Sequence, residues 1–230
     1  MKMRPRFKAV FFDAGGTLFE PNPPVGVTYA ETARKFGCHV SADELETRFR
    51  NEWEKKDQNP HLHGPVMERQ WWYDLVKEVF DPFGGVPQFE DFFSELHDLF
   101  ARPDYWQLFP EVDGVLQKLK SQGVVLGIVS NWDSRLLPLC EKVGIHDHFD
   151  FILASGIVGS SKPDPGIFQE ALRRSQAAPH EAIHVGDSLK DDIQGSHRVG
   201  INAVLVDRSG RRKYPVPTID NLKNLLPLVL

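Results

Sequence analysis

The chain has 230 residues, of which 41% are hydrophobic and 26% are charged, a balance typical of globular proteins. Its net charge of −5 gives no sign of the basic surface that binds nucleic acid or an anionic membrane. Its apolar runs are far shorter than the ~20 residues that cross a bilayer, and the basic start lacks the apolar region of a signal peptide. We therefore expect a cytoplasmic protein.

The first predicted strand, at about Phe7 to Phe12, stops abruptly at a lone carboxylate, Asp13. A turn with two glycines, Gly15 and Gly16, follows it. Aspartate is seldom buried without a partner, and open α/β folds bind their ligands at the carboxyl edge of a parallel sheet. Asp13 is therefore the candidate reactive residue.

The next segment has helical patterning and no convincing strand. Glu20-Pro-Asn-Pro-Pro24 has the composition of a linker, and apolar residues then recur at helical spacing. Ser41-Ala-Asp-Glu44 has the pattern of a capping box. We expect residues 20–106 to form a helical domain inserted into a core domain made of residues 1–19 and 107–230. His61 and His63 lie in a loop without acidic or cysteine neighbours, which disfavours a metal site there.

Beyond residue 110, predicted strands and helices alternate. Apolar runs predict strands at about 124–129, 149–154, 182–185 and 202–206, and periodic patterns predict helices at about 112–122, 134–143, 165–175, 190–198 and 222–230. Such alternation indicates right-handed βαβ units and a parallel sheet covered on both faces. The expected fold is an α/β, Rossmann-like core with an inserted α-helical domain.

Four segments of this core carry polar residues where a strand ends or a helix is about to begin: Asp13, Ser130-Asn131, Lys162 and Asp187. Because the carboxyl ends of parallel strands lie side by side, we expect these residues to converge. Two carboxylates suit a hard cation such as Mg²⁺, and a lysine suits a phosphoryl oxygen or offsets the carboxylates. This set fits covalent catalysis by an aspartate on a phosphorus atom.

The combination resembles the haloacid dehalogenase superfamily of hydrolases. Its motifs occur in the expected order over about residues 7–207, as Asp13-Ala-Gly-Gly-Thr-Leu18, Ser130-Asn131, Lys162-Pro163-Asp164-Pro165, and Gly186-Asp187-Ser188 with Asp191-Asp192. The helical insert is similar to the cap of the subgroup with an α-helical cap. The runs SNWDSRL, KPDPGIFQEAL and HVGDSLKDDIQG look like the branch related to the rhythmically expressed gene 2 product.

The resemblance implies a phosphatase that acts on a small phosphorylated metabolite. Asp13 would be the nucleophile that forms an aspartyl-phosphate. Ser130, Asn131 and Thr17 would bind the phosphoryl group, and Lys162 would stabilise it. A small molecule is the expected partner, and the default expectation is a monomer, with a dimer possible.

The resemblance also implies an Mg²⁺ site. Asp13, the carbonyl of Gly15 and Asp187 would hold the ion. Asp192 or Asp191 would lie behind it, orienting a water or the lysine. Asp192 is preferred, because an apolar residue follows it as the helix begins to pack.

The chain departs from the family at Gly15, where its phosphatases usually carry a second aspartate that serves as general acid and base. Glycine has no proton to give, and general acid–base catalysis is typically worth ~10²–10⁴-fold. Glu20 or Asp133 could substitute for the missing acid. Two alternatives therefore stay open: a metal-independent 2-haloacid dehalogenase and a weakly catalytic binding or regulatory protein.

Residues other than Gly15 bear on the dehalogenase alternative. Those enzymes need no Mg²⁺ and do not usually keep the Gly186-Asp187 pair, so its presence favours the metal-dependent reading. They would also need an arginine of the cap near the halide. Arg34, Arg48 and Arg50 are candidates, although each could equally lie on a solvated helix face.

Overall fold

A computed structural model describes residues 5–56, 65–210 and 214–230; His61 and His63 lie outside these residues. The chain divides into two compact units. The core unit comprises Met1–Phe19 and Leu108–Leu230, and the helical unit comprises Glu20–Gln107. Gln107, which the sequence placed with the core, thus belongs to the helical unit.

The core unit is built on a six-stranded sheet in the order β5-β4-β1-β6-β7-β8, in which every adjacent pair is parallel. The strands are β1 (Ala9–Phe12), β4 (Val125–Ser130), β5 (Phe151–Ala154), β6 (Ala182–Gly186), β7 (Asn202–Val206) and β8 (Thr218–Ile219). The expected α/β parallel-sheet fold is therefore confirmed. β8 escaped sequence analysis because two residues are too short to show a periodicity.

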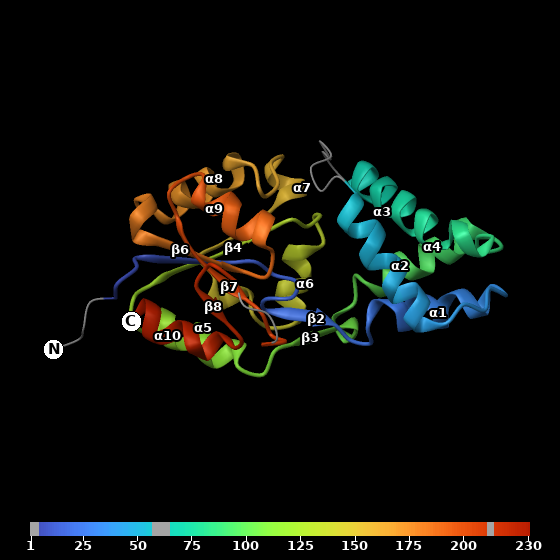
Figure 1. The fold of residues 1–230 in the computed structure, drawn as a ribbon, viewed down its shortest axis with the longest axis horizontal. Helices are drawn as coiled ribbons and strands as arrows, with labels where there is room; N and C mark the ends of the chain where they lie inside the picture. Colours follow the sequence, from blue (N-terminus) through green and yellow to red (C-terminus); the bar gives the residue numbers. More distant parts are fainter. Residues whose placement is uncertain (1–4, 57–64, 211–213) are drawn as a thin grey trace. The chain divides into compact units, whose positions relative to one another are not determined.

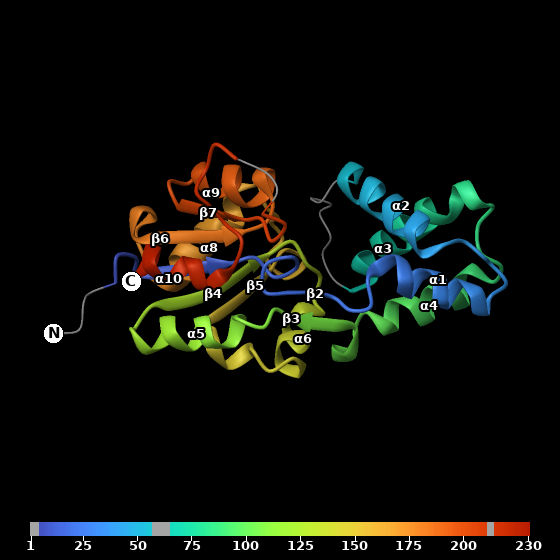
Figure 2. The same cartoon turned by 60° about the horizontal axis from the view of Figure 1, so that its bottom comes forward.

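Helices cover both faces of this sheet. α8 (Pro165–Ser175) and α9 (Gly195–His197) lie over one face, and α5 (Val112–Ser121) and α6 (Leu136–Lys142) lie over the other (Figure 2). The first face has a continuous apolar core that includes Ala9, Phe11, Ile167, Phe168 and Ala171. With apolar side chains on both faces, the central strand β1 is fully buried, as parallel sheets require.

Two of the helices expected in the core unit differ from the regular pattern. The segment at 190–198 begins as a π-helix at Leu189–Gln194 and becomes α-helical only at α9. The amide of Ile193 donates to the carbonyl of Ser188 at 3.2 Å, which is the five-residue spacing of a π-turn. The C-terminal segment is a 3₁₀-helix at Leu222–Leu225 followed by α10 (Leu226–Val229).

Short elements complete the core unit (Figure 1). They are α7 (Ser155–Val158) and the 3₁₀ turns His146–His148 and Pro179–Glu181. None of the described helices has both the length and the apolar character needed to cross a membrane.

The helical unit contains α1 (Val25–Lys35), α2 (Ala42–Lys55), α3 (Pro65–Phe80) and α4 (Phe89–Leu99), with 3₁₀ turns at Asp81–Phe83 and Pro103–Tyr105. The predicted capping box is present. The amide of Glu44 donates to Ser41 Oγ at 3.3 Å, and the amide of Ser41 donates to Glu44 Oε2 at 3.4 Å. The unit is packed largely by aromatic rings, with the Phe80 and Phe92 centroids 5.1 Å apart.

Two short strands were not expected from the sequence. β2 (Phe19–Pro21) and β3 (Trp106–Leu108) pair with each other in a separate two-stranded sheet. They lie where the chain passes from one unit to the other. Each has three residues, and its partner is distant in sequence, so no local pattern could reveal the pairing.

Candidate active site

Strand β1 places Asp13 at the carboxyl edge of the sheet. Its last residue, Phe12, pairs with Ile128 of β4 on one side and with Val185 of β6 on the other. The backbone amide of Asp13 then donates to the carbonyl of Val185 at 2.9 Å. The connections reverse direction at β1, so Asp13 lies at the switch point where open α/β sheets bind ligands.

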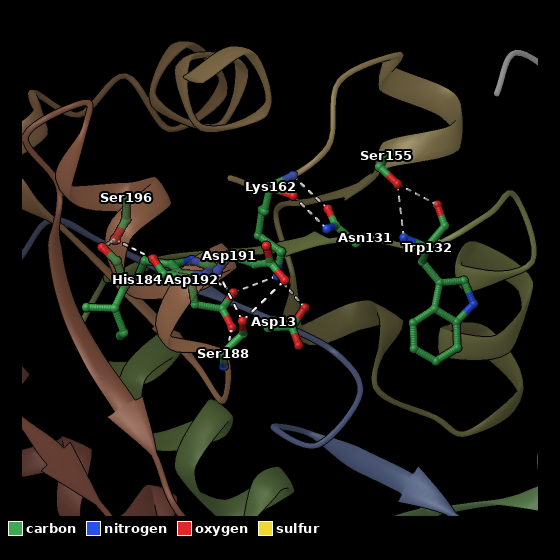
Figure 3. A network of polar contacts seen from close by, with 11 residues as sticks. Asp13, Asn131, Trp132, Ser155, Lys162, His184, Ser188, Asp191, Asp192 and Ser196 are labelled. Carbon is green, nitrogen blue, oxygen red and sulfur yellow. Dashed lines mark hydrogen bonds and ion pairs between the residues drawn. The ribbon is translucent and has the colours of Figure 1, made fainter. Parts of the chain in front are cut away.

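Lys162 joins the candidate nucleophile to a second carboxylate. Its Nζ lies 2.6 Å from Asp13 Oδ1 and 2.6 Å from Asp192 Oδ1 (Figure 3). Its side chain is only 3% exposed. A buried lysine between two carboxylates is satisfied electrostatically, whereas an unpaired one would be costly.

The pKa values in this cluster follow from burial and mutual attraction. Burial raises the pKa of Asp13, although Lys162 and, to a smaller extent, the hydroxyl of Ser130 oppose the rise. Burial alone would lower the pKa of Lys162, but Asp13 and Asp192 raise it above its usual range. The lysine therefore stays an ammonium ion beside the nucleophile.

Asp192 has partners on both carboxylate oxygens. Oδ1 lies 2.8 Å from His184 Nε2 as well as contacting Lys162, and Oδ2 accepts from the amide of Ser188 at 2.9 Å. Burial would raise the pKa of Asp192, yet Lys162 and His184 hold it below its usual range. A Cβ at Gly186 would lie 2.1 Å from Asp192 Cγ, so glycine is required there. The arrangement suits an anion that orients Lys162.

Asp191 makes different contacts. Its amide donates to Ser188 Oγ at 3.1 Å, and that hydroxyl donates back to Asp191 Oδ2 at 3.2 Å. These hydrogen bonds cap the start of the helical segment. Of the two aspartates that the sequence left open, Asp192 is the one that lies against Lys162.

The side chain of Asn131 is engaged by the backbone of Lys162. Its Nδ2 donates to the Lys162 carbonyl at 2.8 Å, and its Oδ1 accepts from the Lys162 amide at 2.7 Å. Because both ends of the amide are used, Asn131 holds the lysine segment in place. Ser130, which is 2% exposed, lies at the end of β4.

Three acidic side chains come close enough to share a cation. One oxygen each from Asp13, Asp187 and Asp192 lies within 4.8 Å of the others. The pKa of Asp187 is raised to about 8, because its carboxylate is desolvated and is repelled by Asp13 and Asp192. The residue as a whole is nevertheless exposed. One lysine does not balance this negative charge, and oxygen donors suit Mg²⁺. The residues therefore fit the expected ion.

The turn after Asp13 is fixed by a residue that sequence analysis missed. Arg208 donates from Nη2 to the carbonyl of Thr17 at 2.6 Å and from Nε to the carbonyl of Gly16 at 3.2 Å. Its Nη1 lies 2.7 Å from Glu111 Oε1, and its guanidinium stacks 3.3 Å above the Phe109 ring. The available signal was its place just beyond β7, since Asp13, Asn131 and Asp187 also directly follow strands.

Thr17 itself is fully buried, and its hydroxyl makes no hydrogen bond within the described residues. His184 is a second residue that sequence analysis missed, although a histidine inside the apolar run of β6 was a visible signal. Its ring packs edge-on against Phe168, with the centroids 5.2 Å apart. Thr17 thus contributes through its backbone, and His184 supports Asp192.

The two proposed substitutes for the missing acid lie in different settings. Asp133 is buried and paired with Arg135, whose Nη2 is 2.5 Å from Oδ2 and whose Nε is 3.0 Å from both oxygens. Glu20 is exposed and belongs to the helical unit. A forked ion pair stabilises the ionised carboxylate, and this disfavours Asp133 as the missing proton donor.

Comparison with known proteins identifies the family of the chain. The family model of the haloacid dehalogenase-like hydrolases matches residues 7–200. The haloacid dehalogenase-like hydrolase domain-containing protein 3 of Bos taurus is 35% identical over 211 residues, which are 90% of this chain and 84% of the relative. The rhythmically expressed gene 2 protein of Drosophila melanogaster is 30% identical, and the match covers 90% of this chain and 85% of that protein.

Solved structures agree with this assignment. A phosphatase of the family from Thermococcus onnurineus has a TM-score of 0.67 and 28% identity, and the match covers 96% of this chain and 97% of that one. A 2-haloacid dehalogenase from Pseudomonas syringae shares the fold, with a TM-score of 0.67 and 24% identity over the same shares. The chain belongs to the haloacid dehalogenase-like hydrolases, in the branch of the rhythmically expressed gene 2 protein.

Proposed function

We propose that the protein is a metal-dependent phosphatase that acts on a small phosphorylated metabolite through Asp13. The observation that carries this proposal is the position of Lys162 Nζ, 2.6 Å from Asp13 Oδ1, beside two further carboxylates. A nucleophilic carboxylate needs a nearby cation that stabilises negative charge on the phosphoryl oxygens. The likeness to the Thermococcus phosphatase supports the same conclusion.

In the first step an oxygen of Asp13 attacks phosphorus, and the bond to the leaving oxygen breaks with its electron pair. Lys162 faces the developing negative charge, while Asp192 keeps its ammonium group in place. In the second step water attacks phosphorus, the carboxylate of Asp13 is released, and the hydrogens of the water leave on the phosphate. Two easier steps replace one difficult displacement.

Asp13, the carbonyl of Gly15 and Asp187 would hold Mg²⁺, with Asp192 behind it. When bound, the ion supplies positive charge that neutralises the carboxylates and the phosphoryl oxygens. In this chain, Gly16 allows the close approach of Asp187, because a Cβ at residue 16 would lie 2.3 Å from Asp187 Oδ2.

The dehalogenase alternative has less support. Asp187 adds a third carboxylate to the site, and such a group opposes an anionic substrate unless a cation is present. The three arginines considered as halide ligands are either paired with carboxylates or exposed. Arg48 pairs with Glu52 at 2.9 Å and Arg50 pairs with Glu46 at 3.0 Å, while Arg34 is exposed.

The test is hydrolysis of p-nitrophenyl phosphate with and without Mg²⁺, beside release of chloride from 2-chloropropionate. We expect Mg²⁺-dependent phosphate release and no chloride. Asp13→Asn should lower kcat by at least ~10⁴-fold, as loss of a covalent nucleophile does. Asp98→Asn is the matched control, because that side chain is 86% exposed. Activity that survives Asp13→Asn, or chloride release without metal, would overturn the proposal.

A further inference from the structure

The space beside Gly15 is bounded by the hydrocarbon edge of the Trp132 indole. A Cβ built on Gly15 would lie 3.2 Å from Cζ3 and 3.9 Å from Cη2 of Trp132, and apart from the adjacent residues no other described residue comes within 4 Å of it. These two carbons belong to the benzene ring of the indole, so the N–H of the five-membered ring points elsewhere. Trp132 therefore occupies the space into which a side chain at residue 15 would extend.

The position of Trp132 is fixed by several contacts within the core unit. Its amide donates to Ser155 Oγ at 3.1 Å, and its carbonyl accepts from that hydroxyl at 3.2 Å and from the amide of Gly156 at 3.0 Å. Figure 3 shows this pairing beside Asn131 and Lys162. The indole also packs edge-on against Phe19, with the centroids 5.6 Å apart. These contacts hold the Trp132 ring in a defined position beside Gly15.

The two sides of Asp13 thus differ in chemistry. One side carries Lys162 and the carboxylates, and the other carries a glycine and a hydrocarbon edge. A hydrocarbon edge cannot give a proton to a departing alkoxide. General acid catalysis is worth ~10²–10⁴-fold, and its value is greatest when the leaving oxygen is strongly basic.

We propose that Gly15 and Trp132 make this site selective for substrates whose phosphoryl group is carried on an acidic oxygen. Acyl phosphates and phosphates of acidic hydroxyls belong to this class. Their leaving groups have pKa values of about 4 for a carboxylate and about 10 for a phenolate. An ordinary alcohol resembles water, with a pKa of about 16, and its alkoxide needs a proton. This inference rests on the proposed phosphatase function.

The reaction balances without a proton donor at residue 15. The phosphorus–oxygen bond to the substrate breaks as the bond to Asp13 forms, and the leaving group departs as a carboxylate or phenolate with the electron pair. Water then cleaves the aspartyl-phosphate. It returns the carboxylate of Asp13 and gives dihydrogen phosphate, which loses a proton to solvent at neutral pH.

The test measures kcat/KM with Mg²⁺ for acetyl phosphate, p-nitrophenyl phosphate, phenyl phosphate and glycerol phosphate. We expect a monotonic fall along this series, with p-nitrophenyl phosphate exceeding glycerol phosphate by at least ~10²-fold. If Asp13-dependent hydrolysis occurs with equal kcat/KM for all four, this inference fails and the proposed function stands. If none is hydrolysed, both fail.

Variants test the role of the indole. Gly15→Asp combined with Trp132→Ala should lower the ratio of kcat/KM for p-nitrophenyl phosphate to kcat/KM for glycerol phosphate by at least ~10-fold. Gly15→Asp alone should lower this ratio less. Gly15→Asn with Trp132→Ala is the matched control, because it has the same size without an acid, and it should leave the ratio wide. Equal narrowing by Gly15→Asp with and without the indole would overturn the role of Trp132. Should a variant fail to fold, the wild-type series still decides the substrate class.

Discussion

Both units have apolar interiors, but the core unit also buries a charged cluster at its sheet edge, whereas the interior of the helical unit is rich in aromatic rings. The core unit buries a connected set of charges, in which Lys162 bridges Asp13 and Asp192. The helical unit buries rings; for example, the Tyr29 centroid lies within 6.1 Å of the Phe49, Phe80 and Phe100 centroids. Burying charge is costly even when it is paired, whereas burying rings stabilises directly. The charged cluster of the core unit is therefore better explained by catalysis than by stability, whereas the rings of the helical unit are explained by packing.

Charged pairs in the helical unit lie mainly at its surface. The side chains of Lys35 and Glu95 form an ion pair and are 60% and 37% exposed. Pairs of this kind contribute little to stability. Substitutions in the two units should therefore affect different properties. Those in the helical interior should change stability, and those in the charged cluster of the core unit should change turnover. The following experiments test this separation.

Phe92→Ala should have the largest effect on stability. The ring is fully buried and packs against Phe36, Phe80 and Phe89 at centroid distances of 5.8, 5.1 and 5.7 Å. Removing such a ring leaves a cavity and costs about 3–5 kcal/mol, measured as the free energy of unfolding in urea. The half-buried Phe89 offers the matched control, and Phe89→Ala should cost less. Equal costs would contradict the assignment of Phe92 to the centre of this interior.

Arg208→Met should lower kcat/KM by about 10–100-fold, because a small misplacement of catalytic groups has effects of this size. The arginine fastens the turn after Asp13 through the carbonyls of Gly16 and Thr17. Arg208→Lys should rescue only part of the loss, since an ammonium group lacks the forked geometry. Arg173→Met is the control, because Arg173 pairs with Glu170 at the surface. A loss of stability without a change in turnover would show that Arg208 is only structural.

Asp187→Asn should change how stability depends on pH. Asp187 has a pKa of about 8 in the folded protein, above the value of about 4 of an unperturbed aspartate. The folded state therefore holds a proton that the unfolded state has lost, so the metal-free protein should lose stability as the pH rises from ~4 to ~8. Asp187→Asn should flatten this decline in thermal unfolding curves. Mg²⁺ should stabilise the wild type more at pH 8 than at pH 6. If the stability of the metal-free wild type rose between pH ~4 and ~8, repulsion between Asp187 and its neighbouring carboxylates would be contradicted.

The smallest effect is expected for the two cysteines, both of which are unpaired and buried. Burial raises the pKa of the Cys140 thiol to about 12 and also raises the pKa of Cys38. Because only the thiolate reacts readily, native protein should resist labelling by a disulfide reagent at pH 8. Unfolded protein should label at both positions, which mass spectrometry of the peptides can verify. Rapid labelling of native Cys140 would contradict its burial in the core unit.

Local sequence signals revealed the parallel sheet and the residues at its edge. The apolar run before Asp13 and the two glycines after it show where β1 ends, and Lys162 precedes a recognisable helix start. These are short-range patterns, so they can be read without coordinates. β2 and β3 could not be found in this way, because three-residue strands carry no period and pair across a long separation.

The sequence by itself determined that a carboxylate, a lysine and further aspartates meet at one edge of an α/β sheet, since parallel topology leaves no other place for strand ends. Only the tertiary structure decided which groups touch. It directed the amide of Asn131 to the backbone of Lys162, gave Asp192 its three partners and brought Arg208 to the turn of Gly16. It also set the indole of Trp132 against Gly15, because side-chain direction and long-range packing are not encoded in any local pattern.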